Sequence, residues 1–248
     1  MPALVASIHA FLRGKQGVDG RDKPGHDGVK NDNAELRRNG MLKIWGRNTS
    51  SNVQKVIWAL AEMKLPFERI DVGGAFGKTK DPFYLAMNPN SLVPTLEEED
   101  GFTMWESNSI VRYLAAKQQN RTLEPADPKS RARAQMWMDW QLSVMAPAIT
   151  PVFWGLIRTP PEKRDPKAIE AGKEKTIVAA RMMDEQLGKT RFMAGDEFSY
   201  GDIPVGIMIY RYMQLIPERP ATPNLDRWYA AISSRPAFKE QIAVVPLT

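Results

Sequence analysis

The chain has 248 residues, enough for one large domain or two smaller ones, and its 43% hydrophobic and 25% charged residues are ordinary globular proportions. Its 34 basic and 29 acidic residues are interspersed, so the net charge of +5 forms no basic stripe and argues against nucleic-acid binding. The chain contains no cysteine, which excludes disulfides, thiolate-bound metals and redox chemistry of a protein thiol.

Residues 1–40 are expected to lie outside the fold. The stretch VDGRDKPGHDGVKNDN is crowded with glycine, aspartate and lysine and lacks periodicity, so it has little surface to bury. Because Met41 begins the strand-like LKIWG, we interpret residues 1–40 as a disordered extension or a mis-assigned start, with a functional tail as the alternative. In this segment the basic residues follow the apolar stretch, whereas in a secretory signal they precede it. The uninterrupted apolar runs of the chain are shorter than the roughly 18 residues that a membrane span requires. We therefore expect a cytoplasmic protein with no membrane partner.

Both histidines, His9 and His26, belong to this extension. The folded part is then expected to hold neither histidine nor cysteine, which excludes a serine–histidine triad and zinc hydrolysis. We expect no metal, and we expect the reactive group to come from a ligand.

Residues 41–118 alternate between strand and helix patterns. Leu42 to Trp45 is a short apolar run, and VQKVIWALAEMKL spaces its apolar side chains as in a helix that begins near Asn52. FERIDV alternates as a half-buried strand does, and VPTLEEEDGFTMWE predicts a hairpin around Asp100 and Gly101. A helix over ESNSIVRYLAAK closes the segment. The order βαβ, a short connecting helix and then ββα is thioredoxin-like.

Residues 119–128 are a predicted linker and residues 129–248 a predicted helical domain, so the expected fold is an α/β thioredoxin-like domain followed by an all-α domain. Pro147 and Pro151 should kink or divide the first helix. Ser199 to Asp202 fits a capping box, to which we assign stability and no chemistry. The helical patterns cover residues 129–157, 166–188, 201–215 and 224–234.

Several separated motifs now agree with one family. They are WGRNTSSNVQKV, MNPNSLVPTL, WESNSIVRYLA, FSYGDIPVG and RWYAAISSRPAF. In their order and spacing, residues 41–248 resemble bacterial glutathione S-transferases of the theta-like type. The resemblance implies a homodimeric detoxification enzyme that takes glutathione as co-substrate and directs its thiolate at small electrophiles such as organic halides.

The resemblance also implies a glutathione-binding set. In the family the bond corresponding to Val93-Pro94 is cis and turns the valine backbone toward glutathione, which pairs with it like an added strand. Ser107 is expected at the N-cap of a helix, where free N–H groups attract an anion, and in the family this serine and the preceding acid hold the γ-glutamyl group. An ordinary strand start and helix cap are the alternatives. The implied set is Leu92, Val93, Pro94, Glu106, Ser107 and Asn108.

Catalysis requires the glutathione thiolate, because a free thiol has a pKa of about 8.5. Lowering that pKa by two units takes roughly 2.7 kcal/mol of preferential interaction with the anion, which a hydroxyl hydrogen bond and a helix N-terminus can provide. By its position before the helix, Ser50 matches the catalytic serine of theta and zeta transferases. Its neighbours Thr49, Ser51 and Asn52 remain candidates, since each also suits a turn or a cap.

The electrophile pocket has weaker signals. Arg47 and the stretch from Arg158 to Pro161 either border it or are surface charges, which are the commoner case. Aromatic side chains at helical spacing line it or belong to the core, and the core is the commoner place. These aromatic residues are Trp137, Trp140, Phe153 and Trp154.

Two other functions fit the same motifs. One is a non-catalytic interaction protein that keeps the transferase fold, and the other is a glutathione-dependent isomerase or disulfide reductase. The product distinguishes them: a thioether, a rearranged substrate or oxidised glutathione.

Overall fold

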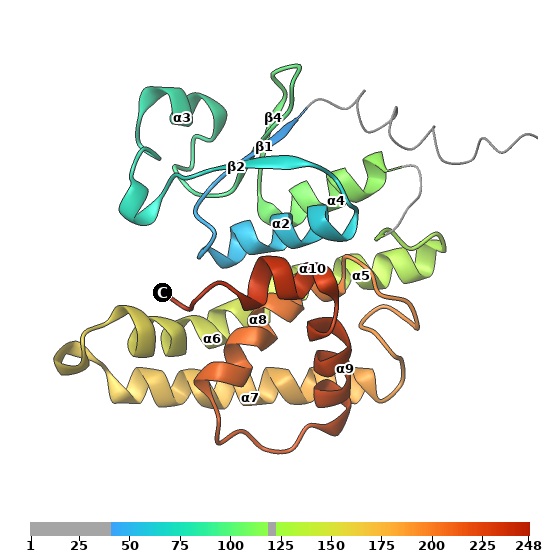
Figure 1. Ribbon diagram of the computed structural model, residues 1–248. Helices are drawn as coiled ribbons and strands as arrows, with labels where there is room; N and C mark the ends of the chain where they lie inside the picture. Colours follow the sequence, from blue (N-terminus) through green and yellow to red (C-terminus); the bar gives the residue numbers. More distant parts are fainter. Residues whose placement is uncertain (1–40, 119–122) are drawn as a thin grey trace, which may run out of the picture.

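The computed structural model describes residues 41–118 and 123–248 (Figure 1). The expectations for residues 1–40, with their two histidines, and for part of the linker lie outside the described residues.

A four-stranded sheet in the order β2-β1-β3-β4 forms the first domain. β1 (Leu42–Trp45) pairs in parallel with β2 (Phe67–Ile70) and antiparallel with β3 (Thr95–Glu97). β3 turns into β4 (Thr103–Trp105) through the expected hairpin. The predicted thioredoxin-like order of strands is confirmed.

Two helices cover one face of this sheet, and the short α3 (Pro82–Met87) lies on the other side (Figure 1). The two are α2 (Ser51–Glu62) and α4 (Ser107–Lys117). Most of the α2 circumference is buried, because one side packs on the sheet and another on a helix of the second domain. The start of α2 is thereby held beside the second domain.

The second domain begins with one continuous helix. It comprises α5 (Pro128–Trp140), a π-helical turn (Gln141–Met145), α6 (Ala146–Phe153) and a second π-helical turn (Trp154–Arg158). The two prolines therefore do not divide it. Each proline removes one N–H from the helical ladder, and the wider π turn before Pro147 accommodates its ring.

By length and composition alone, this helix of 31 residues, with a mean hydropathy of 1.3 over its most apolar window, could span a membrane. The expectation of no membrane span was based on uninterrupted apolar runs, and charged and polar residues interrupt the apolar runs of this helix. In the structure the helix packs against its neighbours in a bundle (Figure 1), as core helices of water-soluble proteins also do.

Further helices complete the bundle (Figure 1). α7 lies along the first helix, and α8 passes beneath α2. A 3₁₀ turn (Pro161–Lys163) precedes α7, and a π-helical turn (Lys239–Ala243) follows α10. The helices are α7 (Pro166–Leu187), α8 (Asp202–Leu215), α9 (Pro223–Ser233) and α10 (Pro236–Phe238).

Asp202 is fully buried at the start of α8 and accepts four hydrogen bonds. Its Oδ2 accepts from Ser199 N at 3.0 Å and Ser199 Oγ at 3.3 Å, and its Oδ1 accepts from Met193 N at 2.9 Å and Trp228 Nε1 at 2.8 Å. The bond to Ser199 N is the half of the predicted capping box that forms. The other half does not, because Ser199 Oγ accepts instead from Gly201 N at 3.2 Å.

Polar contacts join the two domains. Arg235 donates two hydrogen bonds of 2.7 Å to the Glu62 carboxylate, and its guanidinium lies 3.9 Å from the Phe198 ring centroid. Lys55 Nζ donates to Gln141 Oε1 at 2.7 Å. Because these pairs lie between the sheet layer and the helical bundle, they fix how α2 faces α8.

Candidate functional site

A small cavity of about 40 Å³ lies between the loop before β3 and the start of α4. Five residues of the predicted glutathione-binding set line it, although they come from two separate motifs. The lining residues are Asn52, Asn88, Asn90, Leu92, Val93, Pro94, Trp105, Glu106 and Ser107.

The Val93-Pro94 peptide bond is cis, as the resemblance implied. Among the described residues, neither the N–H nor the carbonyl of Val93 takes part in a backbone hydrogen bond, so both are free to pair with an extended peptide.

Two buried polar residues that the sequence analysis missed hold this loop. Tyr84 donates its hydroxyl to Leu92 O at 2.7 Å, and Asn88 Nδ2 donates to the same oxygen at 2.9 Å. Both side chains also contact Thr95 Oγ1. Burial raises the pKa of Tyr84, which keeps the hydroxyl protonated as a donor. In the sequence, the only sign of this role is that Tyr84 and Asn88 are polar residues within a stretch whose pattern is otherwise helical.

The start of α4 differs by one residue from the expectation. Glu106, not Ser107, is the N-cap, and Ser107 is the first helical residue. Glu106 has a φ of 71°, a left-handed conformation that costs a non-glycine residue about 1–2 kcal/mol. The left-handed N-cap turns the chain sharply out of β4, which sequence periodicity does not register.

The α4 N-terminus offers donors to an anion. The first helical hydrogen bond is from Ile110 N to Glu106 O at 2.9 Å, so the N–H groups of Ser107, Asn108 and Ser109 are left over. Together with the helix dipole, they suit a carboxylate. Ser107 Oγ adds a hydroxyl, which donates to Asn52 Oδ1 at 3.4 Å across the cavity.

Asn108 points elsewhere. Its side chain is buried, and Nδ2 donates to Met138 O of α5 at 2.7 Å. It does not line the cavity, so the geometry assigns it a contact between the domains. Its contribution to glutathione binding stays a prediction.

Ser50 is the N-cap of α2, but its side chain makes no capping hydrogen bond. Its backbone is fixed by Ser50 N donating to Arg47 O at 3.2 Å and by Gln54 N donating to Ser50 O at 2.9 Å. The side-chain hydroxyls of Thr49, Ser50 and Ser51 have no hydrogen-bond partner among the described residues. Three hydroxyls at the positive end of α2 are thus available to an anion, and the choice of Ser50 among them stays a prediction.

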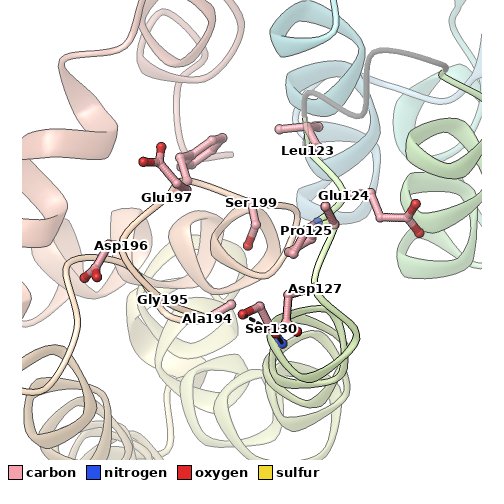
Figure 2. A pocket seen from close by; sticks show the side chains of 12 residues that line it. Leu123, Glu124, Pro125, Asp127, Ser130, Ala194, Gly195, Asp196, Glu197 and Ser199 are labelled. Atoms are coloured by element: carbon pink, nitrogen blue, oxygen red, sulfur yellow. Dashed lines mark hydrogen bonds between the residues drawn. The ribbon is translucent and has the colours of Figure 1, made fainter.

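A larger cavity of about 530 Å³ lies between the segment before α5 and the loop before α8 (Figure 2). None of the predicted site residues lines it. Four of the lining residues are acidic, namely Glu124, Asp127, Asp196 and Glu197, and their negative charge would repel a tripeptide that itself carries two carboxylates. Asp127 also caps α5 by accepting from Ser130 N at 2.8 Å (Figure 2).

The predicted pocket aromatics divide between core and surface. Trp137 and Phe153 are buried, whereas Trp154 is exposed. Trp137 packs edge-on against Trp140, with ring centroids 5.0 Å apart. Among the described residues, no three side chains of histidine, cysteine, aspartate or glutamate come together as a metal site.

Family models for two domains match the chain. The N-terminal domain of glutathione S-transferases matches residues 49–117, and the C-terminal domain of glutathione S-transferases matches residues 145–236. These two segments contain the candidate hydroxyls, the cavity and most of the helical bundle.

Curated relatives and solved structures agree. Glutathione S-transferase GstB of Escherichia coli is 41% identical over 209 residues, which are 84% of this chain and all of the relative. Glutathione S-transferase F13 of Arabidopsis thaliana is 31% identical, covering 79% of this chain and 93% of the relative. The glutathione-bound theta class enzyme of Xanthomonas axonopodis pv. citri superposes with a TM-score of 0.79 at 41% identity, covering 84% of this chain and 99% of the other.

Proposed function

The chain is an enzyme of the glutathione S-transferase family, and from that premise we propose that it ionises the thiol of bound glutathione for attack on small electrophiles such as organic halides. The observation that carries the proposal is the cavity that brings Val93 and Ser107 together beside the start of α2. Each of these groups suits a different part of the tripeptide.

The two ends of the cavity suit the backbone and the γ-glutamyl end of glutathione. The unpaired N–H and carbonyl of Val93 can take the cysteinyl backbone as an added strand would. The α4 N-terminus and Ser107 Oγ can hold the γ-glutamyl carboxylate, while the exposed Glu106 carboxylate can hold its ammonium group. Held at both points, the thiol would be directed toward the first turn of α2.

The thiolate would be stabilised by Ser50 Oγ, which donates to sulfur, and by the positive end of α2. The thiol proton leaves to solvent. The thiolate then attacks the electrophilic carbon, a C–S bond forms, and the bond to the halogen breaks with its electron pair to release halide. Ser50 serves the sulfur, so its loss should affect turnover more than glutathione binding.

The test compares Ser50→Ala with Ser51→Ala as the matched neighbour and Ser107→Ala as the binding variant. We expect Ser50→Ala to lose about 10- to 100-fold in kcat over a panel of alkyl halides, haloacids, aromatic chlorides and peroxides, because a hydrogen bond to an anion contributes about 1.5–3 kcal/mol. Glutathione affinity by calorimetry should change little in Ser50→Ala and fall in Ser107→Ala.

Other outcomes would reassign the roles. Unchanged turnover in Ser50→Ala with a loss in Ser51→Ala would move the catalytic hydroxyl by one residue. Undiminished affinity in Ser107→Ala would remove the γ-glutamyl pocket. Binding of glutathione with no turnover of any electrophile would favour an interaction protein, whereas oxidised glutathione or a rearranged substrate would indicate a reductase or an isomerase.

We further propose that the enzyme is a cytoplasmic homodimer that serves detoxification, since this is the assembly and role that the family resemblance implies. Two apolar side chains, Trp105 on β4 and Met136 on α5, are exposed in the single chain, which supports an interface in which a second copy would cover them. Sedimentation would report one species of twice the chain mass, and a monomer at micromolar concentration would contradict it.

A further inference from the structure

Lys55 is a cation in a place where cations are costly. Its side chain is fully buried in α2, and its ammonium donates one hydrogen bond among the described residues, to Gln141 Oε1 at 2.7 Å. Lys43 and Lys117 each form an ion pair with a carboxylate, whereas Lys55 forms none in the ranges 41–118 and 123–248. A buried charge without a countercharge is strongly unfavourable, so an anion bound nearby would relieve it.

The position of Lys55 on α2 directs this charge toward the candidate site. Lys55 follows Ser51 by four residues, which places both residues on the same side of the helix, one turn apart. Helical side chains lean toward the N-terminus of their helix, so the ammonium is directed toward the first turn of α2. The start of α2 is where the proposed glutathione thiolate lies.

The charges that act on Lys55 connect it with the small cavity. Burial lowers the pKa of Lys55 to about 7, while the Glu106 carboxylate opposes the shift and Arg211 adds to it. Glu106 lines the cavity, and Ser107 Oγ beside it lies 3.4 Å from Asn52 Oδ1 in the first turn of α2. The lysine and the cavity are therefore close enough to act on each other electrostatically.

Of the elements packed against α2, only α4 and α8 present a charge to the lysine among the described residues, through Glu106 and Arg211. The π-helical turn after α5 and the short α10 contain no charged residue. In the π-helical turn after α10, Lys239 and Glu240 are exposed. The charged side chains of β1, the others of α4, and Asp202 of α8 have partners of their own.

We propose that the buried ammonium of Lys55 is the countercharge of the glutathione thiolate and acts on the sulfur through the first turn of α2 without touching it. The inference rests on the proposed transferase function and adds a residue that favours the ionised thiol over the neutral one. When the ammonium group of glutathione pairs with Glu106, that carboxylate balances the lysine less well, and the thiolate takes its place.

The coupling between the two charges is reciprocal. The thiolate favours the protonated form of Lys55, and the protonated lysine lowers the pKa of the bound thiol by the same amount. The lysine exchanges no proton with the substrate in this scheme, since the thiol proton leaves to solvent. Its role is to stabilise the charge that forms on sulfur.

The cost of the buried lysine to the fold separates this role from a structural one. A neutral side chain at position 55 should make the folded protein more stable, because no charge is then buried. The same change should make the bound thiol harder to ionise. A variant that gains stability and loses thiolate has therefore lost a functional charge and kept its fold.

The test removes the charge in two ways. Lys55→Met removes the charge and the hydrogen bond to Gln141, whereas Lys55→Gln removes the charge and keeps an N–H donor. Lys175→Met, on the exposed face of α7, is the matched control. The pKa of bound glutathione is titrated through the ultraviolet absorbance of its thiolate. Calorimetry then measures the affinity for S-methylglutathione, which has no thiol.

We expect both Lys55 variants to raise the pKa of the bound thiol by about one unit, since two unit charges about 10 Å apart in a partly buried site interact on this scale. Their kcat/KM for an alkyl halide should fall about tenfold at pH 6.5 and recover as the pH rises above the pKa of the thiol. Their affinity for S-methylglutathione should be unchanged, and Lys175→Met should match the unaltered protein in every measurement.

Two results would overturn the proposal while leaving the transferase function standing. One is an unchanged pKa of the bound thiol in both Lys55 variants. The other is weaker binding of S-methylglutathione together with lower stability in urea, because the lysine would then support the fold and not the thiolate. If the unaltered protein bound no glutathione, the proposed function and this inference would both fail.

Discussion

Lys55 offers a sharp test of how the domain contact is built. Its side chain is fully buried in α2, and its one hydrogen bond among the described residues goes to Gln141 of the second domain. Burial lowers the pKa of Lys55 to about 7, with Arg211 lowering it further and Glu106 opposing the shift. We therefore expect Lys55→Met to stabilise the protein at neutral pH.

The magnitude follows from linkage between protonation and folding. Between pH 7 and the ordinary lysine pKa of 10.5, the unfolded chain binds a proton that the folded chain does not, so stability rises with pH over this window. Below pH 7 both states are protonated and the penalty is fully present. At about 1.4 kcal/mol per pKa unit, the penalty is at most about 5 kcal/mol. In Lys55→Met, Gln141 Oε1 loses its hydrogen-bond donor, which costs about 1–3 kcal/mol and offsets part of the stabilisation.

The assay is urea unfolding of Lys55→Met and of the unaltered chain at pH 6.5, 7.5, 8.5 and 9.5, at one protein concentration. The variant should be a few kcal/mol more stable at pH 6.5, and the difference should shrink as pH rises. Lys175→Met, on the exposed face of α7, is the control and should follow the unaltered chain. If the free energies of unfolding of Lys55→Met and of the unaltered chain changed with pH in parallel, the buried lysine would hold its proton as an ordinary lysine does, and the linkage argument would be refuted.

Two further predictions concern stability. Asp202→Asn should destabilise the protein by about 2 kcal/mol or more in urea unfolding. Each carboxylate oxygen of Asp202 accepts two of the four hydrogen bonds, and the amide NH₂ of asparagine, which replaces one of these oxygens, would face two donors. Equal stability would mean that the four hydrogen bonds contribute little. Arg235→Gln should lower stability by about 1–3 kcal/mol, since it leaves the buried Glu62 without its bidentate partner, and Glu62→Gln combined with it should cost less than the sum. Strict additivity in that cycle would show that the two residues do not act as a pair.

The sequence determined the thioredoxin-like order because strand and helix periods are local properties. The alternation in FERIDV and the helical spacing after Asn52 follow from which side chains must face a core, and both elements formed where expected within a residue or two. The cis Val93-Pro94 bond and the Glu106-Ser107 pair were likewise readable as short motifs. The motif did not predict that Glu106 would be the N-cap, because a left-handed φ does not affect the hydrophobic pattern of the sequence.

Only the tertiary structure decided which distant side chains meet. Arg158 was expected either to border a pocket or to be a surface charge. In the structure its guanidinium and that of Arg211 both lie near the Phe153 ring, because α8 packs against α6 (Figure 1). The same packing buries Lys55 against Gln141 and turns Asn108 toward α5. A helical period tells which face of a helix is covered but not which helix covers it, so these contacts became visible only once both domains were in place.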